Sequence, residues 1–317
     1  MEFYEKIKMI ETVRQDIADI IGIDIYSIKS NVSYTVLEIV QEDGYIRKKI
    51  EYDSFGDMVP AYLLIPEKVD NAPAVLINHQ HNSERHFGKS EVCGIVGSPY
   101  QAFGPVLARH GFVVLVPDVI CFEERRKNAH GIEPLANDMD FWNHLNEMCY
   151  RILSGNCLMK KILEYTMMAI TLLSEFPGVD KSRIGTLGHS MGGNTVQFLS
   201  ALDERISFAC ASGSACSFKN RMENCVGIEL ASVVPNLYKK YDIGDLLACV
   251  APRKILIVSA DDDKYSRDAE DVVNVAKRTY AELNVEDNIT HVRYKGGHAL
   301  TQERFEYIVK WILSVAG

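Results

Sequence analysis

Short apolar runs alternate with amphipathic segments from about residue 72 to the end of the chain. The runs that predict buried parallel strands cover residues 73–78, 112–118, 183–188, 206–212, 253–260 and 290–296. Apolar residues at helical spacing predict helices over residues 100–111, 157–176, 193–202, 267–283 and 302–315. Strands that alternate with helices predict a mostly parallel sheet with helices on both faces.

The first 70 residues carry a different pattern. Apolar residues at helical spacing predict a helical N-terminal arm over residues 1–30, and they are Ile7, Ile10, Val13, Ile17, Ile20 and Ile21. Two strand-like runs, Ser33–Val40 and Ile46–Tyr52, flank the turn signal Glu42-Asp43-Gly44 and predict a hairpin. A third strand is predicted over Val59–Ile65. We expect these antiparallel strands at one edge of a mixed sheet.

The organisation along the chain favours one α/β domain over residues 1–317, because no internal repeat, low-complexity tract or linker interrupts it. Residues 119–150 and 213–250 are long and irregular for plain connections. Segments of that kind usually serve as caps or binding loops, so we expect both to be cap or pocket insertions.

Composition narrows the class of protein. The chain of 317 residues is 47% hydrophobic and 24% charged, with a net charge of −9, which argues against nucleic acid or an anionic membrane surface as a partner. The N-terminus lacks the apolar core of a signal peptide, and no apolar run is long enough to cross a bilayer. The eight cysteines form no Cys-x-x-Cys pair, as expected for reduced thiols. A cytoplasmic enzyme is expected, and its oligomeric state is left open.

The stretch Gly188-His189-Ser190-Met191-Gly192 fits Gly-x-Ser-x-Gly between a predicted strand and a predicted helix. Such a turn holds a serine in a strained backbone and presents its hydroxyl as a nucleophile, while the N–H of Met191 faces the oxyanion that forms. A phosphate-binding loop would need Gly-x-Gly-x-x-Gly, and the glycines at 185, 188, 192 and 193 have the wrong spacing.

A serine nucleophile needs a base, and the base needs an acid that orients it. Two later strand ends supply both residue types. His298 follows the last predicted strand and is the favoured base, with His291 as the competing histidine at the start of that strand. The strand before it ends on three aspartates, Asp261 to Asp263, of which at most one can orient the imidazole.

The loop after the first parallel strand, residues 78–91, is rich in histidine. It is expected to supply the second oxyanion donor as a backbone N–H, from His81 or Gln80. A zinc site is the alternative, with ligands drawn from His79, His81, His86 and Asp118. Their spacing matches no compact metal motif, so neither a metal nor a cofactor is expected.

These motifs resemble the α/β-hydrolase superfamily, and more narrowly its dienelactone-hydrolase-like and acetyl-xylan-esterase-like branch. The resemblance covers about residues 46–317 and rests on "PAVLINHQHNSERHFGKSE", "FVVLVPDVICFEERR", "GVDKSRIGTLGHSMGG", "APRKILIVSADDDKYS" and "GGHAL". It implies an α/β-hydrolase fold. It also implies that Asp263, three residues after Ala260, is the acid, and that His81, the second residue after His79, is the backbone donor.

The expected function is hydrolysis of carboxylic esters of small or medium-sized molecules by Ser190, His298 and Asp263 through an acyl-enzyme. Gln80, His189, Arg125 and Trp142 are candidates for the substrate pocket. Arg125 or Arg126 could hold a substrate carboxylate, as a lactonase would need, or could belong to a salt-bridged loop. A thioesterase or acyltransferase, or a non-catalytic ligand-binding relative, are further alternatives, whereas a peptidase would usually bring a large extra domain.

Overall fold

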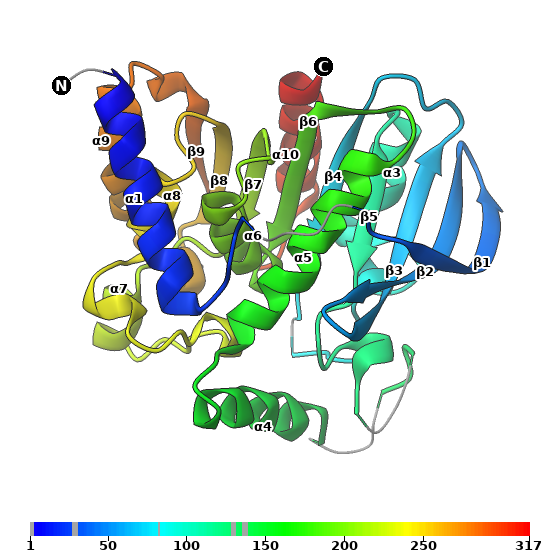
Figure 1. Ribbon diagram of the computed structural model, residues 1–317, viewed down its shortest axis with the longest axis horizontal. Helices are drawn as coiled ribbons and strands as arrows, with labels where there is room; N and C mark the ends of the chain where they lie inside the picture. Colours follow the sequence, from blue (N-terminus) through cyan, green and yellow to red (C-terminus); the bar gives the residue numbers. More distant parts are fainter. Residues whose placement is uncertain (1–2, 27–30, 82, 128–130, 135–138) are drawn as a thin grey trace.

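One mixed sheet organises the chain (Figure 1). The computed structural model describes residues 3–26, 31–81, 83–127, 131–134 and 139–317. Within these residues the sheet has nine strands in the order β1-β2-β3-β5-β4-β6-β7-β8-β9. Their bounds are β1 (Tyr34–Glu42), β2 (Tyr45–Ser54), β3 (Asp57–Pro66), β4 (Ala72–Asn78), β5 (Val113–Pro117), β6 (Val179–His189), β7 (Phe208–Ser212), β8 (Lys254–Ala260) and β9 (Ile289–Tyr294).

The strand directions confirm the mixed sheet that the hydrophobic pattern predicts. β1, β2 and β3 form an antiparallel meander, and β3 also pairs with β5 in the antiparallel sense. From β5 through β4, β6, β7 and β8 to β9 all neighbouring strands are parallel. The central strands β4, β5 and β7 are almost wholly buried because helices cover both faces of the sheet.

Two apolar cores lie on opposite faces of the sheet, and each is closed by its own helices. One core contains side chains of α1 (Phe3–Ile21), α5 (Leu158–Glu175), α6 (Met191–Leu202), α8 (Ile243–Ala248) and α9 (Ala269–Glu282). The other contains side chains of α3 (Phe103–Arg109) and α10 (Gln302–Ala316). This double covering is the α/β architecture expected from the alternation of strands and helices.

The N-terminal helix is shorter than the predicted arm. α1 ends at Ile21, and Gly22 follows with φ 78°, a left-handed conformation that glycine adopts without strain. The N–H groups of Gly22 and Ile23 both donate to the carbonyl of Ala18, at 2.8 and 3.0 Å, and so terminate the helix. Residues 1–2 and 27–30 of the predicted arm lie outside the described residues.

The two long segments contain more regular structure than predicted. Residues 119–150 hold most of α4 (Met139–Leu153), in which only His144 is fully buried. Residues 213–250 hold α7 (Phe218–Glu223) and α8, and the short α2 (Lys89–Val92) lies in the loop after β4. Residues 128–130 and 135–138 lie outside the described part of the chain. Among the described helices, none is both long and apolar enough to cross a membrane.

The turn from β6 into α6 packs directly against β4. A Cβ added to Gly192 would lie 1.9 Å from the carbonyl oxygen of Asn78, and one added to Gly188 would lie 2.3 Å from the backbone of Gly192. Real Cβ atoms do not approach backbone atoms so closely, so both positions need glycine. The close approach sets the height of α6 above the sheet.

Gly192→Ala is therefore expected to lower the free energy of unfolding by about 3 kcal/mol, because the new methyl group must displace backbone rather than a flexible side chain. Urea-induced unfolding followed by circular dichroism measures this change. The matched control is Gly297→Ala, since a Cβ at the exposed Gly297 meets no atom within 4 Å. A loss of the same size in both variants would contradict the packing argument.

Candidate active site

Ser190 occupies the tight turn between β6 and α6. Its φ of 56° and ψ of −118° place a non-glycine residue in a sparsely populated backbone region. Two hydrogen bonds hold this conformation: the Ser190 N–H donates to the Ser212 carbonyl at 2.8 Å, and the Asn194 N–H donates to the Ser190 carbonyl at 3.0 Å. Met191 is the first residue of α6, so its N–H has no acceptor within the helix.

The side chains of Ser190, His298 and Asp263 form one hydrogen-bonded line. Nε2 of His298 lies 2.7 Å from Oγ of Ser190, and Nδ1 lies 3.0 Å from Oδ1 of Asp263. Each residue follows the carboxyl end of a parallel strand: Ser190 follows β6, Asp263 follows β8, and His298 follows β9. The arrangement can remove a proton from the serine hydroxyl and stabilise the resulting imidazolium.

Asp263 is anchored by more than the imidazole. Its carboxylate accepts hydrogen bonds from the Tyr265 N–H at 2.9 Å and from the Ser266 hydroxyl at 2.7 Å. Burial alone would raise the pKa of this carboxyl, but the hydrogen bonds from His298, Ser266 and Tyr265 hold the pKa below its usual value. Asp263 is therefore a fixed, ionised partner for His298.

The neighbouring aspartates and the competing histidine lie elsewhere. Asp261 forms an ion pair with Arg293 at 2.8 Å, and Asp262 is exposed. Nε2 of His291 lies 2.8 Å from the Ser259 hydroxyl. Of the three adjacent carboxylates, the fold brings the third to His298.

His189 packs under the imidazole of His298, with ring centroids 4.9 Å apart. Burial, aided by the neighbouring His298, lowers the pKa of His189 to about 3, so this ring is neutral. Nδ1 of His189 is 3.0 Å from the Ser212 hydroxyl. A positive charge that develops on His298 therefore meets a neutral ring rather than a second cation.

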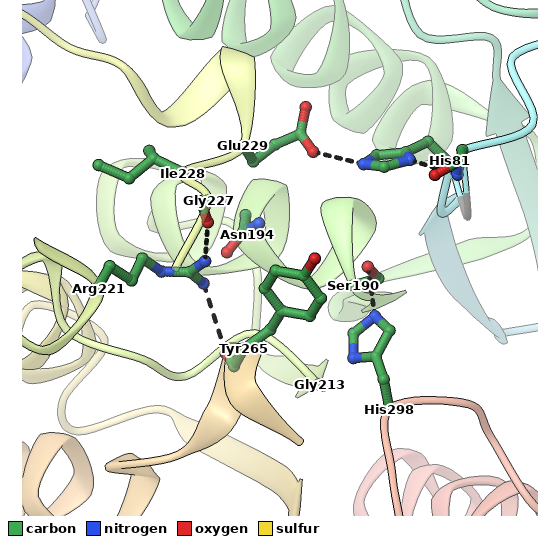
Figure 2. A pocket seen from close by; sticks show the side chains of 11 residues that line it. His81, Ser190, Asn194, Gly213, Arg221, Gly227, Ile228, Glu229, Tyr265 and His298 are labelled. Atoms are coloured by element: carbon green, nitrogen blue, oxygen red, sulfur yellow. Dashed lines mark hydrogen bonds and ion pairs between the residues drawn. The ribbon is translucent and has the colours of Figure 1, made fainter. Parts of the chain in front are cut away.

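A cavity of about 190 Å³ opens over Ser190 and His298 (Figure 2). The polar residues that face it include His81, Asn194, Arg221, Glu229 and Tyr265. Residues 213–250 contribute Gly213, Arg221, Gly227, Ile228 and Glu229, so this segment forms much of the wall. None of the described residues of segment 119–150 lines it.

His81 lies in the loop after β4 and faces the cavity with its side chain. Its Nδ1 accepts a hydrogen bond from the Ser83 N–H at 2.8 Å, and its Nε2 lies 2.8 Å from Oε2 of Glu229. Burial alone would raise the pKa of Glu229, but the His81 imidazole outweighs it and holds that pKa at about 2. An ionised, buried carboxylate thus fixes the His81 side chain.

The structure does not bring the other candidate pocket residues into this cavity. The Gln80 amide is turned toward Glu91, 3.1 Å from Oε2, and His189 lies beneath His298. Arg125 lies at a separate surface hollow, where it donates to the Asp118 carbonyl at 2.9 Å and pairs with Asp57. Trp142 is about half exposed on α4.

Arg126 is also committed elsewhere, to Asp140 at 2.8 Å. The salt-bridged loop was thus the better of the two interpretations of Arg125 and Arg126. Neither arginine lines the cavity over Ser190. A carboxylate-binding role for them in a lactonase has no support in this geometry.

The four candidate zinc ligands are engaged separately. Nε2 of His79 accepts from the Val119 N–H at 3.0 Å, and Nε2 of His86 is 3.1 Å from Glu84. Asp118 lies beside Glu123 and Glu124, but the buried ammonium of Lys89 occupies the centre of that acidic group, 2.8 Å from Asp118. The protein supplies its own cation there.

The cavity residues that the sequence did not identify include Asn194, Arg221, Glu229 and Tyr265. Two of these four carried a usable signal, because Asn194 lies one helical turn after Ser190 and Tyr265 lies two residues after Asp263. Arg221 and Glu229 lie within segment 213–250, whose path over the sheet no local pattern predicts.

Comparison with known proteins agrees with the architecture. A model described as the Abhydrolase family matches residues 4–304. YtaP of Bacillus subtilis (strain 168), provisionally named a hydrolase, is 27% identical over 301 residues, which cover 89% of this chain and 93% of YtaP. The resemblance drawn from the motifs is confirmed at the level of the superfamily.

Solved structures share the fold at lower identity. A protein of Bacteroides fragilis NCTC 9343, provisionally named an acetyl xylan esterase, matches with a TM-score of 0.75 and 17% identity over 93% of this chain and 76% of its own. A glucuronoyl esterase from Solibacter usitatus matches with a TM-score of 0.63 and 15% identity over 91% of this chain and 87% of its own. At these identities the likeness concerns the fold.

Glu229 gives the protein a specific acid sensitivity. Its folded-state pKa of about 2 lies below the ordinary value of 4.5, so its stabilisation is complete above about pH 4.5 and is lost as the pH falls toward 2. The free energy of unfolding of the wild type should therefore fall more steeply than that of Glu229→Gln between pH 5 and pH 3. Urea unfolding across this range measures both curves, and parallel curves would contradict the assignment.

Proposed function

The chain belongs to the Abhydrolase family, and on that premise we propose that it is a serine hydrolase that cleaves carboxylic esters of small or medium-sized molecules through an acyl-enzyme. The observation that carries the proposal is the line of hydrogen bonds from Ser190 through His298 to Asp263. It joins an alcohol, a base and a fixed carboxylate at the floor of a cavity.

In the proposed first step, His298 takes the hydroxyl proton as Oγ of Ser190 attacks the ester carbonyl. Asp263 keeps Nδ1 protonated, so that Nε2 is free to act as the base. His298 then gives the proton to the departing alcohol, which leaves the acyl group on Ser190. A water molecule, activated by the same imidazole, releases the acid and restores the serine.

The negative charge on the tetrahedral intermediate needs donors that are in place before the reaction. We assign the N–H groups of Met191 and His81 to this role. Met191 begins α6, where the helix dipole also favours negative charge. The carbonyl and Nδ1 of His81 already accept hydrogen bonds from Glu84 and Ser83, which turns this loop tightly at His81.

Esters that carry hydroxyl groups are the proposed substrates of first choice. Two polar groups face the cavity without a side-chain partner among the described residues: the Asn194 amide and the Tyr265 hydroxyl. Both can donate and accept, as hydroxyl groups require. Two solved structures with this fold, noted above, are named for carbohydrate esters, which agrees with this choice.

Two expectations from the sequence stay predictions. One is a single domain over residues 1–317, and the other is a cytoplasmic location. The proposed mechanism needs neither a cofactor nor a metal.

Ser190→Ala and Asp263→Asn test the mechanism. Ser190→Ala should lower kcat for 4-nitrophenyl acetate by about 10⁴-fold or more, and Asp263→Asn by about 10³- to 10⁴-fold, since the amide no longer holds the reactive tautomer of His298. Spectrophotometric release of 4-nitrophenol measures both. Asp261→Asn and Asp262→Asn are matched controls expected to stay within about threefold of the wild type. Turnover that persists in Ser190→Ala would instead favour a ligand-binding relative with incidental activity.

Tyr265→Phe tests the substrate class. The variant keeps the ring that packs 4.9 Å from His298 and removes only the free hydroxyl. We expect the ratio of kcat/KM for a monoacetylated methyl glycoside over that for cyclohexyl acetate to fall about fivefold, the effect of one hydrogen bond. Tyr238→Phe is the control, because Tyr238 is exposed outside the cavity. An unchanged ratio in Tyr265→Phe would refute the role of the hydroxyl.

A further inference from the structure

Three consecutive side chains anchor the loop after β4 in three directions. His79 accepts from the Val119 N–H at 3.0 Å, and the Gln80 amide donates to the buried Glu91 at 3.1 Å. The His81 imidazole lies 2.8 Å from Glu229, a residue almost 150 positions further along the chain. Val119 and Glu91 lie on the side of the fold that carries the loop. Glu229, in contrast, belongs to the wall that segment 213–250 forms.

Glu229 is itself held rigidly. Its side chain is 8% exposed, and Oε1 accepts a hydrogen bond from the Leu230 N–H at 3.0 Å. The second oxygen, Oε2, is directed at Nε2 of His81 (Figure 2). A buried carboxylate that lost this partner would be left with an uncompensated charge, so the contact is strongly favoured.

The nearby cation Arg85 does not replace His81. Arg85 lies near enough to stabilise the Glu229 carboxylate electrostatically, yet its Nε donates to Nδ1 of His144 at 3.2 Å, and burial lowers the pKa of His144 to about 4, so that ring is neutral. Arg221, on the same wall, donates to the carbonyls of Cys216 and Gly227. The imidazole of His81 is therefore the side chain in direct contact with Oε2 of Glu229.

We infer that Glu229 is a positioning residue, which sets the backbone N–H of His81 against the reacting carbonyl by holding the His81 side chain. The inference rests on the proposed function, in which that N–H is an oxyanion donor. A short, side-chain-anchored loop transmits a shift of the imidazole to its own backbone. An oxyanion donor must stay within about 0.5 Å of its productive position, roughly 2.7–3.1 Å from the oxyanion. Segment 213–250 thus contributes to catalysis without touching the reacting atoms.

Glu229→Gln tests the inference in the full-length protein with 4-nitrophenyl acetate. We expect kcat to fall about 10- to 100-fold while KM changes less than about threefold, because a displaced oxyanion donor weakens transition-state binding rather than substrate binding. Glu229→Asp should restore part of kcat. The control is Glu223→Gln, since Glu223 is an exposed glutamate of the same segment that pairs only loosely with Lys219, at 4.0 Å.

A double-mutant cycle with His81→Ala locates the effect. If Glu229 acts through the imidazole, the double variant should have a kcat within about twofold of that of His81→Ala alone. Additive losses, a loss confined to KM, or an unchanged kcat in Glu229→Gln would each overturn the inference. Should Glu229→Gln fail to fold by circular dichroism, His81→Gln, which keeps a donor for Glu229, must retain more activity than His81→Ala.

Failure of the proposed function is visible separately. In that case the wild type would turn over no ester or would lose nothing in Ser190→Ala. Failure of the inference alone would leave the wild type active, Ser190→Ala inactive, and Glu229→Gln as active as the wild type.

Discussion

The backbone of Ser190 is the constraint on which the rest of the site depends. A serine at φ 56° is unfavourable by about 1–3 kcal/mol, so packing must hold it in place. The close contact of Gly192 with Asn78 and the hydrogen bond from Ser190 to Ser212 supply that packing from the strands on either side of β6. Because α6 starts at this turn, the same constraint fixes the position of Met191, the first residue of that helix.

The parallel strands bring residues from distant parts of the chain together. β6, β8 and β9 run in the same direction, so the residues that follow them emerge at one edge of the sheet. Ser190, Asp263 and His298 reach one another there within hydrogen-bond distance. Their surroundings set the charges at this edge. Hydrogen bonds hold the pKa of Asp263 below its usual value and keep it ionised, and burial lowers the pKa of His189, so that this ring stays neutral beneath His298.

The cavity wall shows a different kind of dependence. Segment 213–250 folds into short helices joined by irregular turns, and it brings Arg221 and Glu229 to the cavity wall and Glu229 into contact with His81 in the loop after β4. Its buried carboxylate and the His81 imidazole join the two sides of the cavity. The wall is therefore part of the same polar network as the proposed oxyanion loop.

The sequence alone determined most of the strands and long helices, the mixed sheet, and Ser190 and His298 of the proposed triad, because hydrophobic period and strand-end position are local properties of the chain. It left the choice among Asp261, Asp262 and Asp263 to family resemblance, and it selected Arg125 and Trp142 for a pocket that they do not reach. Only the tertiary structure decided these points, since an arginine after a strand has the same local signature whether it pairs with Asp57 or faces a substrate. Which partner it meets depends on long-range packing, and that packing also placed Glu229 beside His81.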